Sequence, residues 1–537
     1  MKKSTLTIEI ITLILYTSAL IFIMYYHEPW FDEAQAWLIA RDATILEILS
    51  SITHYEGHPP IWFFILMPFA KSGIPFEIGI KAVNFTLVTL AMGIFIFKAP
   101  FHRFIRCTIP FTYFFFYQYG VISRNYSLLM LGFVLSALMY KDRNEKPFRF
   151  IAALSLICGS SAYGMLIAGG IAIVWLGEIF GKLISLNQIK SFLKSRQFYA
   201  LFILFIFNIW LLNCIYPFHD TYATTAVQKS PDVMLFYMFF MAPADAVCSL
   251  VLSNSTLSYF QLTSYIFISC IIHFIIFVVT KMHQKRALFI VPYLLFGIFG
   301  GIVYFWTHHV GIITMFYMFL FWCCFDKNPK KIEMPIIIQT LIRGDHIKKY
   351  LRIVSYVLVF ILIAKSIYWT IAASINDISL NYGTGRETAA FIKNNKLDHL
   401  NILASWREIE DPTGEKYYDY NSLEGIPALA YFDKNIFYNF NYQLNNQCYL
   451  LHKIDKEGSH TKKCIENAYP EVLLNNSSKY TFGAEINMDD YALVKSVHGN
   501  LIWKDNLIEN REFIFIRKDL LKNYPNLEQL NMEKEKV

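Results

Sequence analysis

Long apolar runs alternate with short polar connections from the first residues to about residue 373. A helix needs about 20 mostly apolar residues to cross the hydrocarbon core of a bilayer. The first such run covers residues 6–26, behind Lys2 and Lys3, and lacks a small-residue cleavage site, so we interpret it as a retained helix. The runs predict about eleven spanning helices. They lie near residues 6–26, 77–97, 103–119, 121–140, 149–162, 163–181, 198–216, 259–280, 287–305, 310–325 and 353–373.

Basic residues give the expected orientation of these helices. Lys and Arg are enriched in cytoplasmic loops, and in this chain they cluster in alternate connections. We therefore expect a cytoplasmic N-terminus and, because the helix count is odd, an extracytoplasmic C-terminal region. The run at 233–251 breaks this alternation if it spans, and its Pro243 and Asp245 favour a surface or re-entrant segment.

The chain changes character after residue 373, where polar and charged residues become evenly distributed. Helices are predicted at 386–394 and 423–431, and strands at LNILAS and EFIFIRK. The fold class is therefore an all-α polytopic membrane protein, residues 1–373, followed by a soluble extracytoplasmic α/β domain, residues 374–537.

Composition agrees with an integral membrane protein. Of 537 residues, 55% are hydrophobic and 17% aromatic, and the mean hydropathy is +0.37. The cytoplasmic loops largely explain the net charge of +7, which gives no reason to expect nucleic acid as a partner. Cys448 and Cys464, in the external domain, could form a disulfide in an oxidising compartment. Neither belongs to a C-x-x-C pair, so a thiolate metal site is not expected.

The most informative polar residues lie in the first outer loop, residues 28–60. Asp32 and Glu33 are adjacent carboxylates at a membrane exit, and Glu56 and His58 follow in the same loop. Such titratable groups at a membrane surface are candidates for proton transfer.

The loop is expected to be rigid. Apolar residues between 32 and 55 predict one or two amphipathic helices in the membrane interface. Asp32 could then simply cap the first helix, with Gln35 three residues later as in a capping box. The proline pair after His58 holds that residue extended and can open the next helix.

Four motifs resemble the GT-C superfamily of integral membrane glycosyltransferases, above all protein O-mannosyltransferases and related bacterial enzymes that use polyprenyl-phosphate sugars. They are FDEAQ and EGHPPIWFFIL in the first outer loop, IGIKAVN in the next helix, and ISRNYSL. Asp32 matches the family's catalytic base, and Lys81 replaces the usual Arg. Arg124 and Tyr126 lie in the last motif. The resemblance covers about the first 140 residues.

The resemblance implies transfer of a monosaccharide from a polyprenyl phosphate, with Asp32 removing the acceptor proton. Glu33 would orient the site or bind the acceptor. Arg124, and less strongly Lys81, would bind the donor phosphate, because a guanidinium at a helix end needs an anion or the interface. Snorkelling or an internal salt bridge would equally explain Arg124.

Other residues are expected near the same cavity. Glu56, His58 and Tyr126 are expected in the active-site loop or at the acceptor. His308 and His309 lie at another outer helix end and could bind phosphate. With Glu56 and His58 they could also bind a divalent cation, but the spacing matches no dedicated metal motif. We therefore name no metal ligands and no certain cofactor, and leave a divalent cation open.

Three other classes of function remain open on sequence alone. A transporter or flippase usually has its polar site near the midplane, and a polysaccharide polymerase or ligase carries its functional residues in a late external loop. A catalytically inactive scaffold is the third. The expected partners are a polyprenyl-phosphate sugar, a lipid, glycan or protein acceptor, and the lipids of a bacterial plasma membrane.

Overall fold

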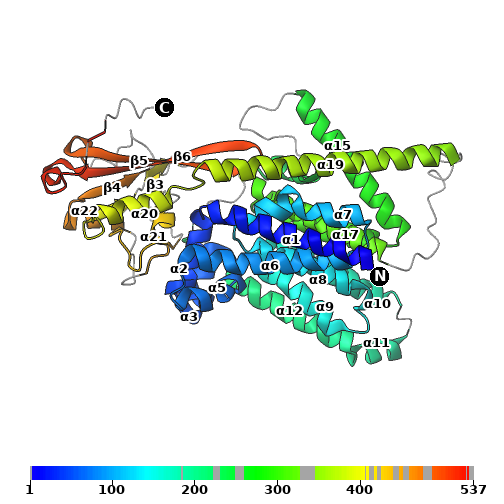
Figure 1. Cartoon of the computed structure of the whole chain (residues 1–537). Helices are drawn as coiled ribbons and strands as arrows, with labels where there is room; N and C mark the ends of the chain where they lie inside the picture. Colours follow the sequence, from blue (N-terminus) through cyan, green and yellow to red (C-terminus); the bar gives the residue numbers. More distant parts are fainter. Residues whose placement is uncertain are drawn as a thin grey trace.

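The structure is a computed structural model. It describes residues 3–182, 185–221, 230–247, 259–326, 345–404, 407–410, 416–419, 425–439, 447–451, 459–475, 486–527 and 529–530. A bundle of helices and a smaller α/β domain lie at opposite ends of the molecule, and α19 leads from one to the other (Figure 1).

Ten longer helices make up most of the bundle. They are α1 (Lys3–Tyr26), α6 (Phe76–Lys98), α8 (Tyr126–Met139), α9 (Pro147–Ser160), α10 (Ala162–Phe180), α12 (Arg196–Ile215), α15 (Tyr259–Met282), α16 (Arg286–Ile302), α17 (Val310–Phe325) and α19 (Asp345–Ser379). Shorter helices in the first outer loop and just after it are α2 (Phe31–Asp42), α3 (Ile45–Glu47), η1 (Ile48–Ile52), α4 (Thr53–Glu56) and α5 (Ile61–Lys71). The remaining connections include α7 (Arg103–Thr108), η2 (Ile109–Phe111), η3 (Phe114–Val121), η4 (Tyr140–Asp142), α11 (Leu186–Leu193), α13 (Pro231–Phe240), α14 (Ala242–Val247) and η6 (Thr307–His309).

Six of the described helices are long and apolar enough to cross a membrane. They cover Leu6–Tyr26, Phe76–Lys98, Ala162–Phe180, Arg196–Ile215, Tyr259–Met282 and Tyr356–Ser379. Five further apolar helices are shorter, at 10–17 residues. The prediction of several membrane-spanning helices is therefore supported, whereas the number eleven and the orientation stay predictions.

Two predicted segments look different in the structure. The run at 103–119 is not one helix, because it divides into α7, η2 and η3 near Pro110, which has no N–H to donate. The described part of 233–251 is α13 and α14, which are broken at Met241 and each too short to span. A surface or re-entrant course stays the prediction for that run.

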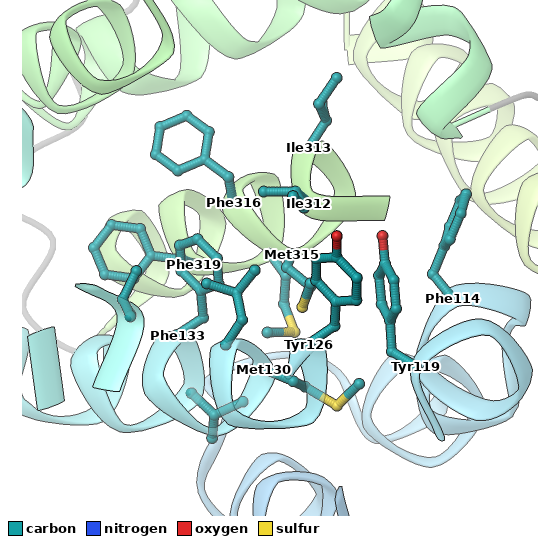
Figure 2. Close-up of a cluster of buried hydrophobic side chains, with 14 of the residues drawn as sticks. Phe114, Tyr119, Tyr126, Met130, Phe133, Ile312, Ile313, Met315, Phe316 and Phe319 are labelled. Atoms are coloured by element: carbon teal, nitrogen blue, oxygen red, sulfur yellow. The ribbon is translucent and has the colours of Figure 1, made fainter. Parts of the chain in front are cut away.

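The packing of the bundle is illustrated by α8 and α17, whose apolar side chains interleave (Figure 2). Phe133 and Phe319 are fully buried in this contact. A Cβ at Gly311 would lie 2.5 Å from the rings of Phe114 and Tyr119, so glycine lets the start of α17 approach η3.

The C-terminal domain is a small α/β unit, as predicted. Its four-stranded sheet has the order β1-β4-β6-β5, with β1 and β4 parallel and the other pairs antiparallel. The elements are α20 (Gly385–Asn394), β1 (Ile402–Ala404), β2 (Arg407–Glu410), β3 (Lys416–Asp419), α21 (Gly425–Leu429), α22 (Ser459–Asn467), β4 (Val472–Asn475), η7 (Met488–Asp490), β5 (Tyr491–Trp503), β6 (Asn506–Arg517) and η8 (Lys518–Asn523).

Two features blur the boundary predicted at residue 373. Helix α19 continues through it to Ser379. The β5–β6 hairpin, which the sequence did not reveal, extends from the domain back beside α19 (Figure 1). Its residue Ile502 is 3% exposed within the apolar core of the bundle, and Leu501 and Trp503 pack against that core.

Candidate functional site

Helix α2 carries the acidic pair and is buried rather than interfacial. Nine of its residues, from Phe31 to Ala40, are buried, and it packs against α5, α6 and α21. A Cβ at Gly79 of α6 would lie 2.1 Å from the ring of Trp37, so the two helices are in close contact. The predicted interfacial amphipathic helix is therefore wrong for α2, because the C-terminal domain covers the face expected to meet water. In α3, Ile45 and Leu46 remain exposed.

Glu33, not Asp32, satisfies the backbone at the start of α2. The Trp30 N–H donates to Glu33 Oε2 at 3.1 Å, and the Ser123 N–H donates to Glu33 Oε1 at 2.6 Å. The expected box from Asp32 to Gln35 is wrong, because the helix begins two residues earlier, after Trp30. Glu33 is fully buried, so it positions backbone and cannot meet an acceptor directly.

A buried histidine fixes Glu33 from the other side. His27 Nε2 lies 3.3 Å from Glu33 Oε2, and His27 Nδ1 lies 2.9 Å from Asp377 Oδ2. The Tyr117 hydroxyl donates to the same Asp377 oxygen at 3.0 Å. Burial lowers the pKa of His27, but the carboxylates of Asp377 and Glu33 outweigh it and raise the pKa to about 9. His27 is therefore protonated at pH 7, with its imidazolium between the carboxylates of Glu33 and Asp377.

Asp32 points to the open side of α2. Its Oδ2 lies 2.8 Å from Arg124 Nη1, and the two side chains are 27% and 13% exposed. The internal salt bridge considered for Arg124 is therefore formed in this structure. Because the pair reaches solvent, both groups are accessible to a ligand.

The Asp32–Arg124 pair lines a pocket of about 110 Å³. This pocket unites four of the predicted site residues from three segments of the chain: Asp32 in α2, Glu56 and His58 in the outer loop, and Arg124 before α8. The other lining residues are Gln35, Ala36, Trp62, Phe63 and Asn125. Pro60 directly precedes α5, as the proline pair suggested, and so fixes His58 at the entrance to that helix.

Gln35 connects the pocket to the C-terminal domain. Its Nε2 donates to Glu56 Oε1 at 2.8 Å and to the Leu450 carbonyl at 2.6 Å. The Leu450 N–H donates back to Gln35 Oε1 at 3.0 Å. The side-chain amide of Gln35 therefore holds both Glu56 and the Leu450 backbone of the C-terminal domain at one side of the pocket.

The two adjacent histidines lie behind the pocket. Their ring centroids are 4.0 Å apart, and the Trp306 N–H donates to His309 Nδ1 at 3.0 Å. The pKa of each is well below its usual range, chiefly through burial, with further lowering of the His309 pKa by His308 and of both pKa values by the Arg124 guanidinium. Both rings are therefore neutral at pH 7, and His309 carries its proton on Nε2.

Tyr126 also lies in this region. Its ring is 6.0 Å from that of His309, and the Arg124 guanidinium carbon is 5.3 Å from its centroid. Among the described residues its buried hydroxyl has no hydrogen-bond partner. Figure 2 shows that the hydroxyls of Tyr126 and Tyr119 point the same way, away from the Met130 side of the cluster.

Lys81 lies apart from the pocket. Its Nζ is 2.6 Å from both Glu77 Oε2 and the His27 carbonyl. Arg386 of the C-terminal domain contacts the same Glu77 through two nitrogens, each at 2.8 Å. The Glu77 carboxylate thus pairs with Lys81 and with Arg386 of the C-terminal domain. Lys81 therefore belongs to the contact between bundle and domain, not to the pocket.

Two further expectations concern sulfur and metal. Cys448 interacts with Asp42 and Arg41, whereas the Cys464 thiol donates to the Tyr438 carbonyl at 3.6 Å, so the structure does not join them in a disulfide. Within the described ranges, no group of three or more His, Cys, Asp or Glu side chains is placed to hold a metal ion.

Sequence reasoning missed His27 and Asp377 and did not identify Gln35 and Asn125 as lining residues. His27 immediately follows the first apolar run and precedes the acidic pair, which was a usable signal. No pattern in the sequence pointed to Asp377, because it lies 350 positions from His27, the residue that it contacts.

Comparison of the chain with family models, with curated proteins and with solved structures finds no match. The likeness to GT-C enzymes therefore rests on the sequence motifs alone. The function has to be argued from the chemistry of the pocket.

Proposed function

We propose that the protein is a glycosyltransferase of the extracytoplasmic membrane face that moves a monosaccharide from a polyprenyl phosphate to a hydroxyl acceptor. The observation that carries this proposal is the solvent-accessible Asp32–Arg124 ion pair on the pocket wall, 2.8 Å apart. It joins a proton acceptor to a phosphate-binding cation, the two groups that the reaction requires.

In the proposed reaction, Arg124 binds the donor phosphate and Asp32 accepts the proton of the acceptor hydroxyl. The acceptor oxygen forms a bond to the anomeric carbon while the bond from that carbon to the phosphate oxygen breaks. The bonding electrons leave with the lipid phosphate, whose charge Arg124 stabilises. One displacement inverts the anomeric centre and needs no protein nucleophile.

The surrounding residues have supporting roles in this proposal. His309 is buried outside the pocket lining, so it is given no direct contact with the phosphate. Glu56 and His58 contact the acceptor from the outer-loop side of the pocket. Glu33 is a positioning residue, since it fixes the first turn of α2 through two backbone N–H groups.

The decisive experiment compares the purified wild type with Asp32→Asn, using radiolabelled polyprenyl-phosphate hexoses and acceptor lipids extracted from membranes. We expect loss of transfer with retained donor binding, because the amide keeps the shape and cannot accept the proton. Glu47→Gln is the matched control, since Glu47 lies in the same loop but does not line the pocket; it caps α3 and accepts a hydrogen bond from Gln447. Equal transfer by folded Asp32→Asn and wild type would exclude Asp32 as the base.

A further inference from the structure

The β5–β6 hairpin ends in an apolar tip that faces two ways. Ile502 and Trp503 pack against the helical bundle. On the partner strand, Leu507 and Ile508 are 45% and 54% exposed. Large apolar side chains exposed together at the end of a hairpin need a covering partner.

The level of the tip relative to the membrane follows from its contacts with α19. The Asn500 N–H donates to the carbonyls of Asn381 at 2.8 Å and Tyr382 at 3.1 Å, just beyond the end of the candidate span at Ser379. From Asn500 the strand continues toward the bundle, and at roughly 3.3 Å per residue its end at Trp503 lies about 10 Å deeper.

A second contact also places the turn below the end of the span. Lys504 Nζ lies 5.2 Å from the ring centroid of Trp369, which is inside the candidate span Tyr356–Ser379. At roughly 1.5 Å per residue, Trp369 is about 15 Å below Ser379 along the helix. That is about half the thickness of a hydrocarbon core.

The charge of Lys504 is accommodated at this depth. Its Nζ lies 3.2 Å from Asp245 Oδ1, and the two side chains are 1% and 2% exposed. The Lys504 N–H also donates to the Tyr113 hydroxyl at 2.9 Å. An ammonium buried in a membrane protein is normally paired in this way, so the ion pair fixes the turn inside the bundle.

The residues along β6 change character at the level where the span ends. Leu507 and Ile508 are opposite Ile502 and Leu501, whereas Glu509 is opposite Asn500. Glu509 and Arg511 form an ion pair at 2.8 Å on the water side of that level. On β6, Leu507 and Ile508 thus lie below the helix end and Glu509 lies at it, while the turn beyond them carries the buried Lys504 and the exposed Asp505.

We propose that the tip of the β5–β6 hairpin is embedded in the outer leaflet, with Leu507 and Ile508 in contact with lipid acyl chains. The domain predicted to be soluble therefore carries a membrane-inserted element of its own. This proposal is independent of the reaction proposed for the pocket.

The test labels single cysteines with an environment-sensitive fluorophore in the full chain, in palmitoyl-oleoyl phosphatidylcholine vesicles. The background carries Cys107→Ser, Cys270→Ser and Cys464→Ser, because these thiols are at least partly accessible, and Cys248→Ser, because Cys248 lies outside the described residues. The labelled variants are Leu507→Cys and Ile508→Cys at the tip, Glu509→Cys at the expected boundary, and Asp519→Cys as the matched water-side control.

We expect the tip labels to have blue-shifted emission, strong quenching by phosphatidylcholine with a doxyl group on its acyl chain, and weak quenching by aqueous iodide. The Asp519 label should show the reverse, and the Glu509 label intermediate values. Iodide quenching of the tip labels equal to that at Asp519 would overturn the proposal. So would protection from iodide without doxyl quenching, because a protein partner would then cover the tip.

Discussion

Asp32 and Glu33 are neighbours in the sequence but have separate tasks in the structure. Successive residues of a helix point about 100° apart, so one carboxylate of α2 faces the pocket while the other faces the buried backbone. Glu33 is fully enclosed, and Asp32 is 27% exposed beside Arg124. The sequence predicts a base at Asp32 and an orienting or acceptor-binding role for Glu33, but it does not show that Glu33 is enclosed, because the start of α2 decides which carboxylate faces the pocket.

His27 gives the protein a pH-dependent stability. Because its folded pKa is raised from 6.5 to about 9, its contribution is complete below about pH 6.5 and is lost as pH rises through 9. We expect the melting temperature in detergent to fall over this interval.

The measurement compares wild type with His27→Gln across that pH range. The variant should melt lower at pH 6.5 and lose most of the wild-type pH slope, while His498→Gln, whose side chain is 46% exposed, should keep it. An unchanged slope in His27→Gln would assign the pH dependence to other groups.

At the scale of elements, the sequence predicted what depends on local composition. The long apolar runs gave α1, α6 and α12 nearly to the residue, and the mixed tail gave α20 and β1. The sequence-based prediction was wrong where contacts between distant segments determine the surroundings of a helix. An example is α2, whose apolar residues pack against α21 of the C-terminal domain and not against lipid. The alternating residues of β5 and β6 were a signal for the hairpin, but nothing local indicates that its tip enters the bundle.

The contact between α2 and α6 can be tested with Gly79→Ala. The added Cβ would lie 2.1 Å from the Trp37 ring and displace α2 together with Asp32. Overpacking of this kind costs about 1–3 kcal/mol, so we expect a lower melting temperature and weaker transfer. Gly169→Ala is the control, since a Cβ there meets nothing within 4 Å. Equal effects of the two variants would contradict close packing at Gly79.

At the scale of the whole molecule, the C-terminal domain is fixed to the bundle by polar contacts. Arg386 contacts Glu77 with two nitrogens at 2.8 Å, and the Tyr431 hydroxyl donates to Glu77 at 2.7 Å. Together with the Gln35 contacts to Leu450, these hold the domain against the pocket wall to which Gln35 belongs.

Arg386→Ala should loosen the domain. Because its side chain is 42% exposed, solvent screening keeps the expected loss near the ~1 kcal/mol typical of exposed pairs. We expect faster cleavage within the C-terminal domain by a protease added to the purified protein. Lys434→Ala, which removes an ion pair to Asp398 inside the domain, is the control and should be cleaved at the wild-type rate. Identical protection of Arg386→Ala and wild type would show that other contacts hold the domain.

The buried Lys504–Asp245 pair also sets an order of assembly. Lys504 is synthesised long after Asp245, yet it fills a place inside the bundle that Asp245 and Tyr113 already surround. The bundle therefore reaches its final packing only after the hairpin has been made and has folded back onto it. Until then Asp245 lacks the Lys504 ammonium with which it pairs in the complete protein.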